Sequence, residues 1–173
     1  LREVINSKNP KYLDNDLIYA SGIEYDNANY DAAYEAYAHV NLVASNSENK
    51  NNSPLGMLRS AYLMKKNTEV VSAAKNILDN AKASPEVANE ARFYRAKALL
   101  NLNRASEAIQ DLQVVAKDTR NVFGAESQFL LTETYYKQKA YDKAEKQVID
   151  FMKQGTPHEY WMARTVIVLS DVY

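Results

Sequence analysis

The segment TETYYKQKAYDKAEKQV, residues 132–148, holds the pattern that decides the fold. It opens with a small residue, Thr132, followed three positions later by a large one, Tyr135. It continues with Ala144 and, four positions on, Val148. Residues three and four apart share one face of an α-helix, where a small side chain lets a neighbouring helix approach and a large one fills the adjoining groove. The segment therefore predicts two helices joined by a tight turn.

Both halves of this pattern recur along the chain. The alanines at 33, 73, 108 and 144 are 40, 35 and 36 residues apart, and a bulky side chain follows each by four positions: Tyr37, Ile77, Leu112 and Val148. The small-then-large pair also recurs, as Gly22/Tyr25, Ala61/Met64, Ala96/Leu99, Thr132/Tyr135 and Ser170/Tyr173. A near-constant period of this length is typical of stacked helical repeats.

The repeated unit resembles the tetratricopeptide repeat, a helix-turn-helix of about 34 residues with small-x2-Tyr in its first helix and Ala-x3-Phe in its second. The best copies are GIEYDNANYDAAYEAY, residues 22–37, and the segment quoted first. The chain departs from the family in lacking the first-helix tryptophan and in its longer periods. The resemblance implies an all-α fold, a right-handed α-solenoid of antiparallel helical hairpins with about four and a half repeats.

Prolines mark the expected start of the first helices. Each of the four prolines follows a residue that caps helices, in the pairs Asn9-Pro10, Ser53-Pro54, Ser84-Pro85 and Thr156-Pro157. Proline at the first helical position loses no hydrogen bond. Asn121 takes the capping place in the fourth repeat, and Thr156 with Glu159 predicts a capping box.

These signals divide a single domain over residues 1–173 into hairpins and one loop. We expect hairpins over 10–44, 54–81, 85–119 and 121–153, followed by a half repeat over 157–173. The low-complexity segment SNSENKNNS, residues 45–53, is expected to form a flexible loop.

Composition excludes several classes of function. Hydrophobic residues make up 46% of the chain and charged residues 25%, the net charge is -1, and the basic residues are scattered, so neither nucleic acid nor an anionic membrane is an expected partner. The chain has no cysteine, which excludes disulfides, thiolate metal sites and a cysteine nucleophile. No apolar run approaches the roughly 20 residues of a membrane-spanning helix.

Residues suited to catalysis or metal binding are few and dispersed. The two histidines, His39 and His158, fall in different repeats, and Glu35 with His39 lacks a third metal ligand. Glycines occur singly, so no phosphate-binding loop is present. We therefore expect no cofactor and no enzymatic activity.

The resemblance also implies which residues contact a partner. In the family, the concave surface of the solenoid is lined by first-helix residues, whose positions are counted from the small residue. Tyr62, Phe93, Phe129 and Tyr136 are expected to lie partly exposed on one continuous face. The full expected set is Tyr19, Leu58, Tyr62, Lys65, Phe93, Lys97, Phe129, Glu133 and Tyr136.

The expected function is therefore a non-catalytic scaffold that binds a protein or peptide on this concave face. The alternative is a structural spacer or self-association segment of a longer solenoid, and an enzyme site shared with another domain is a third reading. Resemblance to bacterial cell-envelope repeat proteins points to the envelope or periplasm, with the cytoplasm left open. The segment from Trp161 to Tyr173 is apolar all round, which predicts that either a further helix or a second copy of the chain covers it.

Overall fold

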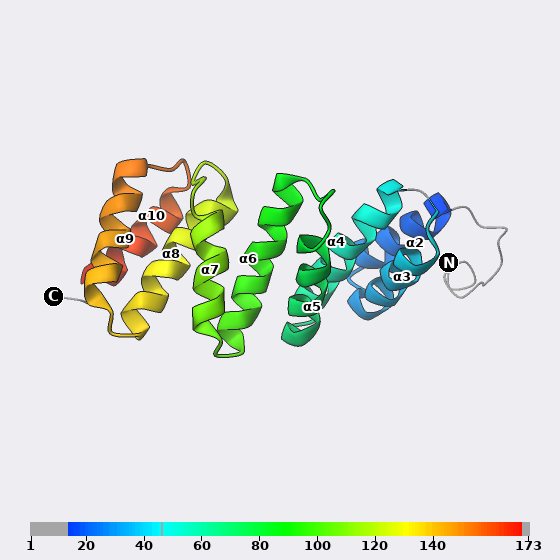
Figure 1. The fold of residues 1–173 in the computed structure, drawn as a ribbon, viewed down its shortest axis with the longest axis horizontal. Helices are drawn as coiled ribbons and strands as arrows, with labels where there is room; N and C mark the ends of the chain where they lie inside the picture. The colour runs from blue at the N-terminus through cyan, green and yellow to red at the C-terminus, as the bar shows by residue number, and fades with distance from the viewer. Residues whose placement is uncertain (1–13, 46, 171–173) are drawn as a thin grey trace. The chain divides into compact units, whose positions relative to one another are not determined.

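The computed structural model describes residues 14–45 and 47–170, and within them every regular element is an α-helix (Figure 1). The expected all-α class is confirmed. The handedness of the solenoid, its number of repeats and its unity as one domain stay predictions. The helices are α2 (Asp14–Asp26), α3 (Tyr30–Val43), α4 (Ser47–Leu63), α5 (Asn67–Leu78), α6 (Pro85–Asn101), α7 (Ala105–Val115), α8 (Val122–Lys137), α9 (Tyr141–Gln154) and α10 (Glu159–Ser170).

The chain divides into two compact units, residues 1–98 and 99–173. In the N-terminal unit α3 packs against α2 and α4, and α4 packs against α5. Alanines fill much of the helix seams, because a small side chain lets two helices approach closely. The buried core of this unit contains Leu58, Ala61, Val70, Ala73, Ala74, Ile77, Ala91 and Ala98.

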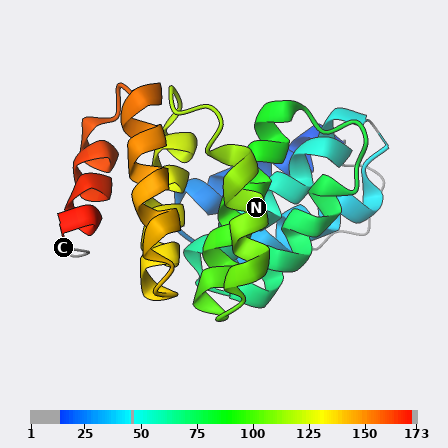
Figure 2. The same ribbon diagram turned by 60° about the vertical axis from the view of Figure 1, so that its left-hand side comes forward.

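In the C-terminal unit α8 packs against α7, α9 and α10, and α10 also contacts α9 (Figures 1 and 2). The predicted seam residues Ala108 and Ala144 are buried, as are their bulky partners Leu112 and Val148. Phe151 is the largest fully buried side chain. The alanine column of the sequence therefore lies in the helix seams, as its spacing predicts.

One kind of turn follows each of the helices α2, α4, α6 and α8. After α4, the Lys65 N–H donates to the Tyr62 carbonyl at 2.9 Å and the Lys66 N–H to the Ala61 carbonyl at 3.0 Å. This pair of bonds with a left-handed residue is the Schellman motif, which satisfies carbonyls at a helix end. The left-handed residues are Ala28, Lys65, Asn103 and Lys139, with φ of 60°, 59°, 59° and 59°.

Two of the predicted helix starts are confirmed. Pro85 is the first residue of α6, and the Ser84 hydroxyl accepts a hydrogen bond from the Val87 N–H at 3.3 Å. Asn121 caps α8 by accepting from the Gly124 N–H at 2.8 Å. Local capping chemistry thus fixes both starts. The start expected at Pro10 lies outside the described residues.

The start expected at Pro54 is wrong, and so is the loop expected over residues 45–53. The helix α4 begins at Ser47 and carries Pro54 in its interior. Proline there removes one backbone hydrogen bond and crowds the carbonyl four residues earlier, a cost that other contacts of α4 must offset. Tertiary contacts hold the polar segment in place, since the buried Asn49 side chain donates to the Asn15 side-chain oxygen at 3.0 Å.

The capping box expected at Thr156 is also absent. The Thr156 hydroxyl accepts from the His158 N–H at 3.1 Å and donates to the Thr119 carbonyl at 2.6 Å, and α10 begins at Glu159. The bond to Thr119 ties this hydroxyl to the loop between α7 and α8, and α10 begins two residues after the start expected at Pro157.

None of the helices in the described ranges is long and apolar enough to cross a membrane.

Candidate partner-binding surface

Three of the expected contact residues are buried, which corrects the prediction. Leu58, Phe93 and Phe129 expose 0%, 2% and 5% of their surface. Each lies three positions before a small seam residue, and residues three apart share a helix face. They therefore point into the seam. The two phenylalanines cannot belong to the partly exposed face expected for them.

The other six expected residues reach the surface to differing extents. Tyr19 is 74% exposed, Lys65 is exposed in the turn after α4, and Glu133 pairs with Lys137 at 2.9 Å. Tyr62, Lys97 and Tyr136 are half-buried. Tyr62 and Lys97 belong to one unit and Tyr136 to the other, so the single continuous face stays a prediction.

The structure brings Tyr62 and Lys97 together around a third residue that the sequence reasoning missed, Tyr94. The Tyr62 and Tyr94 ring centroids are 4.5 Å apart. The Lys97 ammonium lies over the Tyr62 ring at 5.4 Å and over the Phe93 ring at 5.0 Å. Buried Phe93 thus supports the cluster from beneath, and the rings are held in position.

A bidentate ion pair adjoins this cluster. Arg59 in α4 donates to both carboxylate oxygens of Glu90 in α6, at 2.6 and 2.8 Å. The Glu90 side chain is only 11% exposed, whereas that of Arg59 is 43% exposed. These hydrogen bonds raise the pKa of Arg59, so the guanidinium stays charged. The pair joins α4 to α6.

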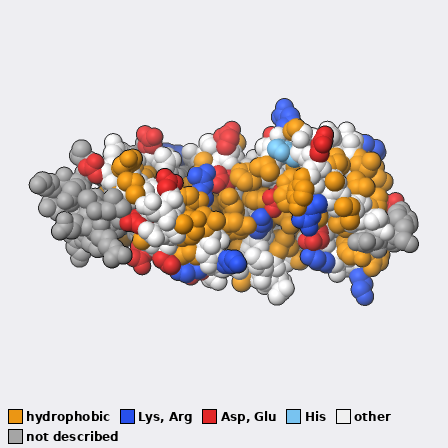
Figure 3. Space-filling model, turned by 180° about the vertical axis from the view of Figure 1, so that it is seen from behind, with side chains coloured by type: hydrophobic (Ala, Val, Ile, Leu, Met, Phe, Trp, Pro, Cys, Tyr) orange, Lys and Arg blue, Asp and Glu red, His pale blue; other side chains and the backbone are white. Residues whose placement is uncertain are grey.

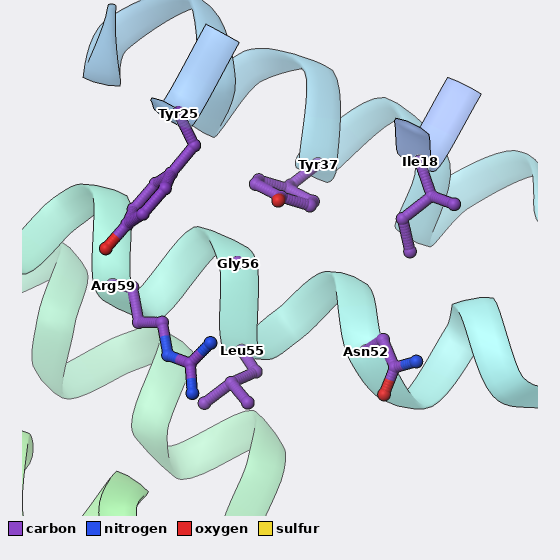
Figure 4. Close-up of a pocket in the computed structure, with 7 residues that line it drawn as sticks. All are labelled: Ile18, Tyr25, Tyr37, Asn52, Leu55, Gly56 and Arg59. Carbon is purple, nitrogen blue, oxygen red and sulfur yellow. The ribbon is translucent and has the colours of Figure 1, made fainter. Parts of the chain in front are cut away.

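A pocket of about 290 Å³ opens beside Arg59 (Figure 4). Tyr25 comes from α2, Tyr37 from α3, and the helix α4 supplies Gly56 and Arg59. A Cβ built on Gly56 would meet the Tyr37 ring at 2.6 Å, so only glycine admits the ring at this distance. The remaining lining residues are Ile18, Asn52 and Leu55.

Three tyrosines of this region have a phenol pKa above the ordinary value. Burial raises the pKa of Tyr25, Tyr37 and Tyr94 above the ordinary value of 10.0, and nearby charges modify the effect. Their hydroxyls stay protonated at neutral pH and can donate hydrogen bonds to a ligand. We call the group of Tyr25, Tyr37, Arg59, Tyr62, Glu90, Tyr94 and Lys97 the Arg59 surface.

A sequence signal for the missed residues exists. Arg59 and Tyr62 in α4 lie two before and one after the small residue Ala61, and Tyr94 and Lys97 lie at the same offsets from Ala96 in α6. In each helix the two residues are three positions apart, so they share the helix face next to the seam. Tyr62 and Lys97 are already in the expected set, and counting the −2 position as well would add Arg59 and Tyr94.

The C-terminal unit carries a different aromatic group. The Arg164 guanidinium lies over the buried Phe129 ring at 4.2 Å from its centroid. Trp161 packs against Phe129 at 5.6 Å, and Tyr160 packs against Trp161 at 4.9 Å. We call these four residues the Arg164 platform. Figure 3, in which this unit is on the right, shows basic side chains (blue) among hydrophobic ones (orange) on the visible face.

Neither group has the composition of a metal centre. Among residues 14–45 and 47–170, no group of three or more His, Asp or Glu side chains could hold a metal ion. The aromatic rings and guanidinium groups instead suit contact with a protein, where Tyr, Trp and Arg dominate binding energy.

No known protein family, curated protein or solved structure matches this chain. The resemblance to tetratricopeptide repeats therefore rests on the residues quoted above and stays a prediction.

Proposed function

We propose that this chain is a non-catalytic scaffold of tetratricopeptide type, and that its Arg59 surface binds a peptide segment of a partner protein. The observation that carries the proposal is the packing of the Tyr62 and Tyr94 rings against each other, with the Lys97 ammonium over the Tyr62 ring, next to a pocket of about 290 Å³. Pockets of this size suit one or two side chains of a bound peptide.

The order of this surface favours binding. Association costs about 0.5–1.5 kcal/mol for each flexible side chain that becomes fixed. Tyr62 and Tyr94 are already in ring contact, and Tyr37 is held against Gly56. A partner would therefore meet side chains whose freedom is restricted before it binds.

The pocket has both apolar and polar parts. Ile18, Leu55 and the two tyrosine rings offer apolar area, while Asn52 is exposed and can bond the backbone of an extended peptide. An apolar peptide side chain in the pocket, with its backbone beside Asn52, is the arrangement that we propose.

Self-association through the C-terminal unit is the second candidate. Met152 in α9 and Ile167 in α10 are 57% and 60% exposed, and Ile149 is 40% exposed. Apolar side chains exposed in this number favour contact with another protein surface, including a second copy.

Site-specific crosslinking in the organism's own cells tests the proposal. A photoreactive amino acid replaces Asn52 at the pocket, with a matched control at exposed Ser72 in α5. We expect a crosslinked partner protein at position 52 alone, and a weaker crosslink when Tyr94→Ala is added.

The outcomes separate the candidates. A crosslink at position 52 that persists unchanged with Tyr94→Ala would exclude the Arg59 surface as the binding site. Crosslinks only between copies of this chain would favour self-association. The bacterial envelope is proposed from the resemblance alone, and fractionation of the same cells tests it.

A further inference from the structure

The Arg164 platform presents a guanidinium group on an aromatic support. The Arg164 Cζ atom is 4.2 Å from the Phe129 ring centroid and 5.8 Å from the Tyr160 and Trp161 centroids. A planar guanidinium stacked on a ring keeps the N–H donors at its edge directed away from that ring. Those donors are arranged to bind a carboxylate through two parallel hydrogen bonds.

Among the described residues, one long bond uses these donors. Arg164 Nη1 donates to the Tyr160 hydroxyl at 3.4 Å, a long bond. Among residues 14–45 and 47–170, no carboxylate forms an ion pair with Arg164. Arg59, by contrast, donates from its Nε and Nη2 atoms to the two carboxylate oxygens of Glu90. Within the described residues, the charge of Arg164 therefore has no carboxylate partner.

Exposed side chains flank the guanidinium along α10. Tyr160, Arg164 and Ile167 follow the i, i+4, i+7 spacing of one helix face, and Tyr160 and Ile167 are 63% and 60% exposed. A ligand that places a carboxylate on Arg164 would bring its neighbouring groups against an aromatic ring on one side and an aliphatic chain on the other.

We propose that Arg164 anchors a carboxylate-binding site, which takes an acidic segment of a partner protein with apolar side chains beside its Asp or Glu. The inference rests on the proposed scaffold function and adds a second contact, in the other unit. A protein is favoured over a nucleic acid because one guanidinium between apolar side chains matches a single carboxylate, whereas a phosphate backbone requires several cations.

Peptide binding tests the site directly. The probes are a fluorescein-labelled nonapeptide in which Leu alternates with Glu, and its counterpart with Gln in place of Glu. Fluorescence anisotropy at physiological salt measures both affinities. We expect the Glu peptide to bind about tenfold more tightly, since a charged hydrogen-bonded pair contributes about 1.4 kcal/mol or more.

Three variants connect the preference to Arg164. Arg164→Gln should reduce the Glu-to-Gln affinity ratio to about one, and Arg164→Lys to about threefold, because lysine keeps the charge but not the planar fork. The control Lys153→Gln removes an exposed charge from α9 of the same unit and should leave the ratio unchanged. Circular dichroism checks that each variant is folded.

Several results would overturn the inference. Equal affinity for the two peptides, absence of measurable binding at millimolar peptide, or a preference for Glu that survives Arg164→Gln would each do so. Binding of a single-stranded oligodeoxynucleotide that depends on Arg164 would replace the carboxylate with phosphate. None of these results affects the crosslink at position 52, so failure here is distinguishable from failure of the proposed function.

Discussion

Two arginines, one in each unit, lie among aromatic rings and differ in what their charge meets. Arg59 donates two hydrogen bonds to Glu90, whose side chain is largely buried. Arg164 lies on the Phe129 ring, and its described hydrogen bond goes to a tyrosine hydroxyl. The first arginine joins two helices, while the second has no carboxylate partner among the described residues and is the one that we propose binds an external partner.

The comparison shows that residue type and aromatic neighbours do not define a binding residue. A buried carboxylate needs a cation, so Glu90 ties Arg59 to the fold. A ring face attracts a cation without neutralising it. The distinction between the two arginines therefore depends on one residue in another helix.

Glycine packing offers the largest expected difference between the units. A Cβ on Gly124 would lie 1.9 Å from the Asp118 carbonyl oxygen, whereas a Cβ on Gly56 would meet only the Tyr37 side chain. A backbone atom moves less readily than a ring. We expect Gly124→Ala to lower the free energy of unfolding by about 3 kcal/mol and Gly56→Ala by about 1 to 2 kcal/mol. Urea denaturation measures both, and a larger loss for Gly56→Ala would contradict this ranking.

Two substitutions compare the arginines directly: one removes the carboxylate that pairs with Arg59, and the other removes the charge of Arg164. Glu90→Gln should lower the free energy of unfolding by about 1 to 2 kcal/mol, a modest value because half-exposed Arg59 can be solvated by water. Arg164→Gln should cost about 0.5 kcal/mol, the loss of an exposed cation–π contact. If thermal and urea denaturation showed equal losses, Arg164 would be a structural residue like Arg59.

The Schellman turns should respond alike in both units. Lys65 and Lys139 have positive φ, which is unfavourable for a residue with a side chain. We expect Lys65→Gly and Lys139→Gly each to raise the free energy of unfolding by about 0.5 to 1 kcal/mol. Ser72→Gly, in the middle of α5, is the matched control and should lower it by a similar amount. A loss of stability at both turns would show that the lysine side chains themselves are needed.

Two buried hydroxyls give the smallest expected effect. Ser60 and Ser127, one in each unit, have no hydrogen-bond partner for their Oγ atoms among the described residues. Ser60→Ala and Ser127→Ala should leave the free energy of unfolding unchanged or raise it by up to about 1 kcal/mol. In contrast, Thr132→Val removes a bond from the Thr132 hydroxyl to the Gln128 carbonyl at 3.0 Å and should destabilise the protein. Melting temperatures that fall for both serine variants would reveal partners for these hydroxyls.

The sequence by itself determined the features that depend on near neighbours along the chain. Helical periodicity predicted the helices, the alanine column predicted the seams, and Ser84 and Asn121 predicted helix starts. Each signal acts within one or two turns of helix, where backbone geometry fixes which residues meet.

Tertiary structure alone decided which face of each helix is buried and which charges are paired. Periodicity placed Phe93 on the same helix face as the seam residue Ala96, yet the resemblance implied a place on the concave surface; the packed structure decides for the seam, with 2% of Phe93 exposed. The pairing of Arg59 with Glu90 joins residues 31 positions apart. Such contacts depend on how separate helices pack, and their free energy comes from burial and charge that no local stretch of sequence contains.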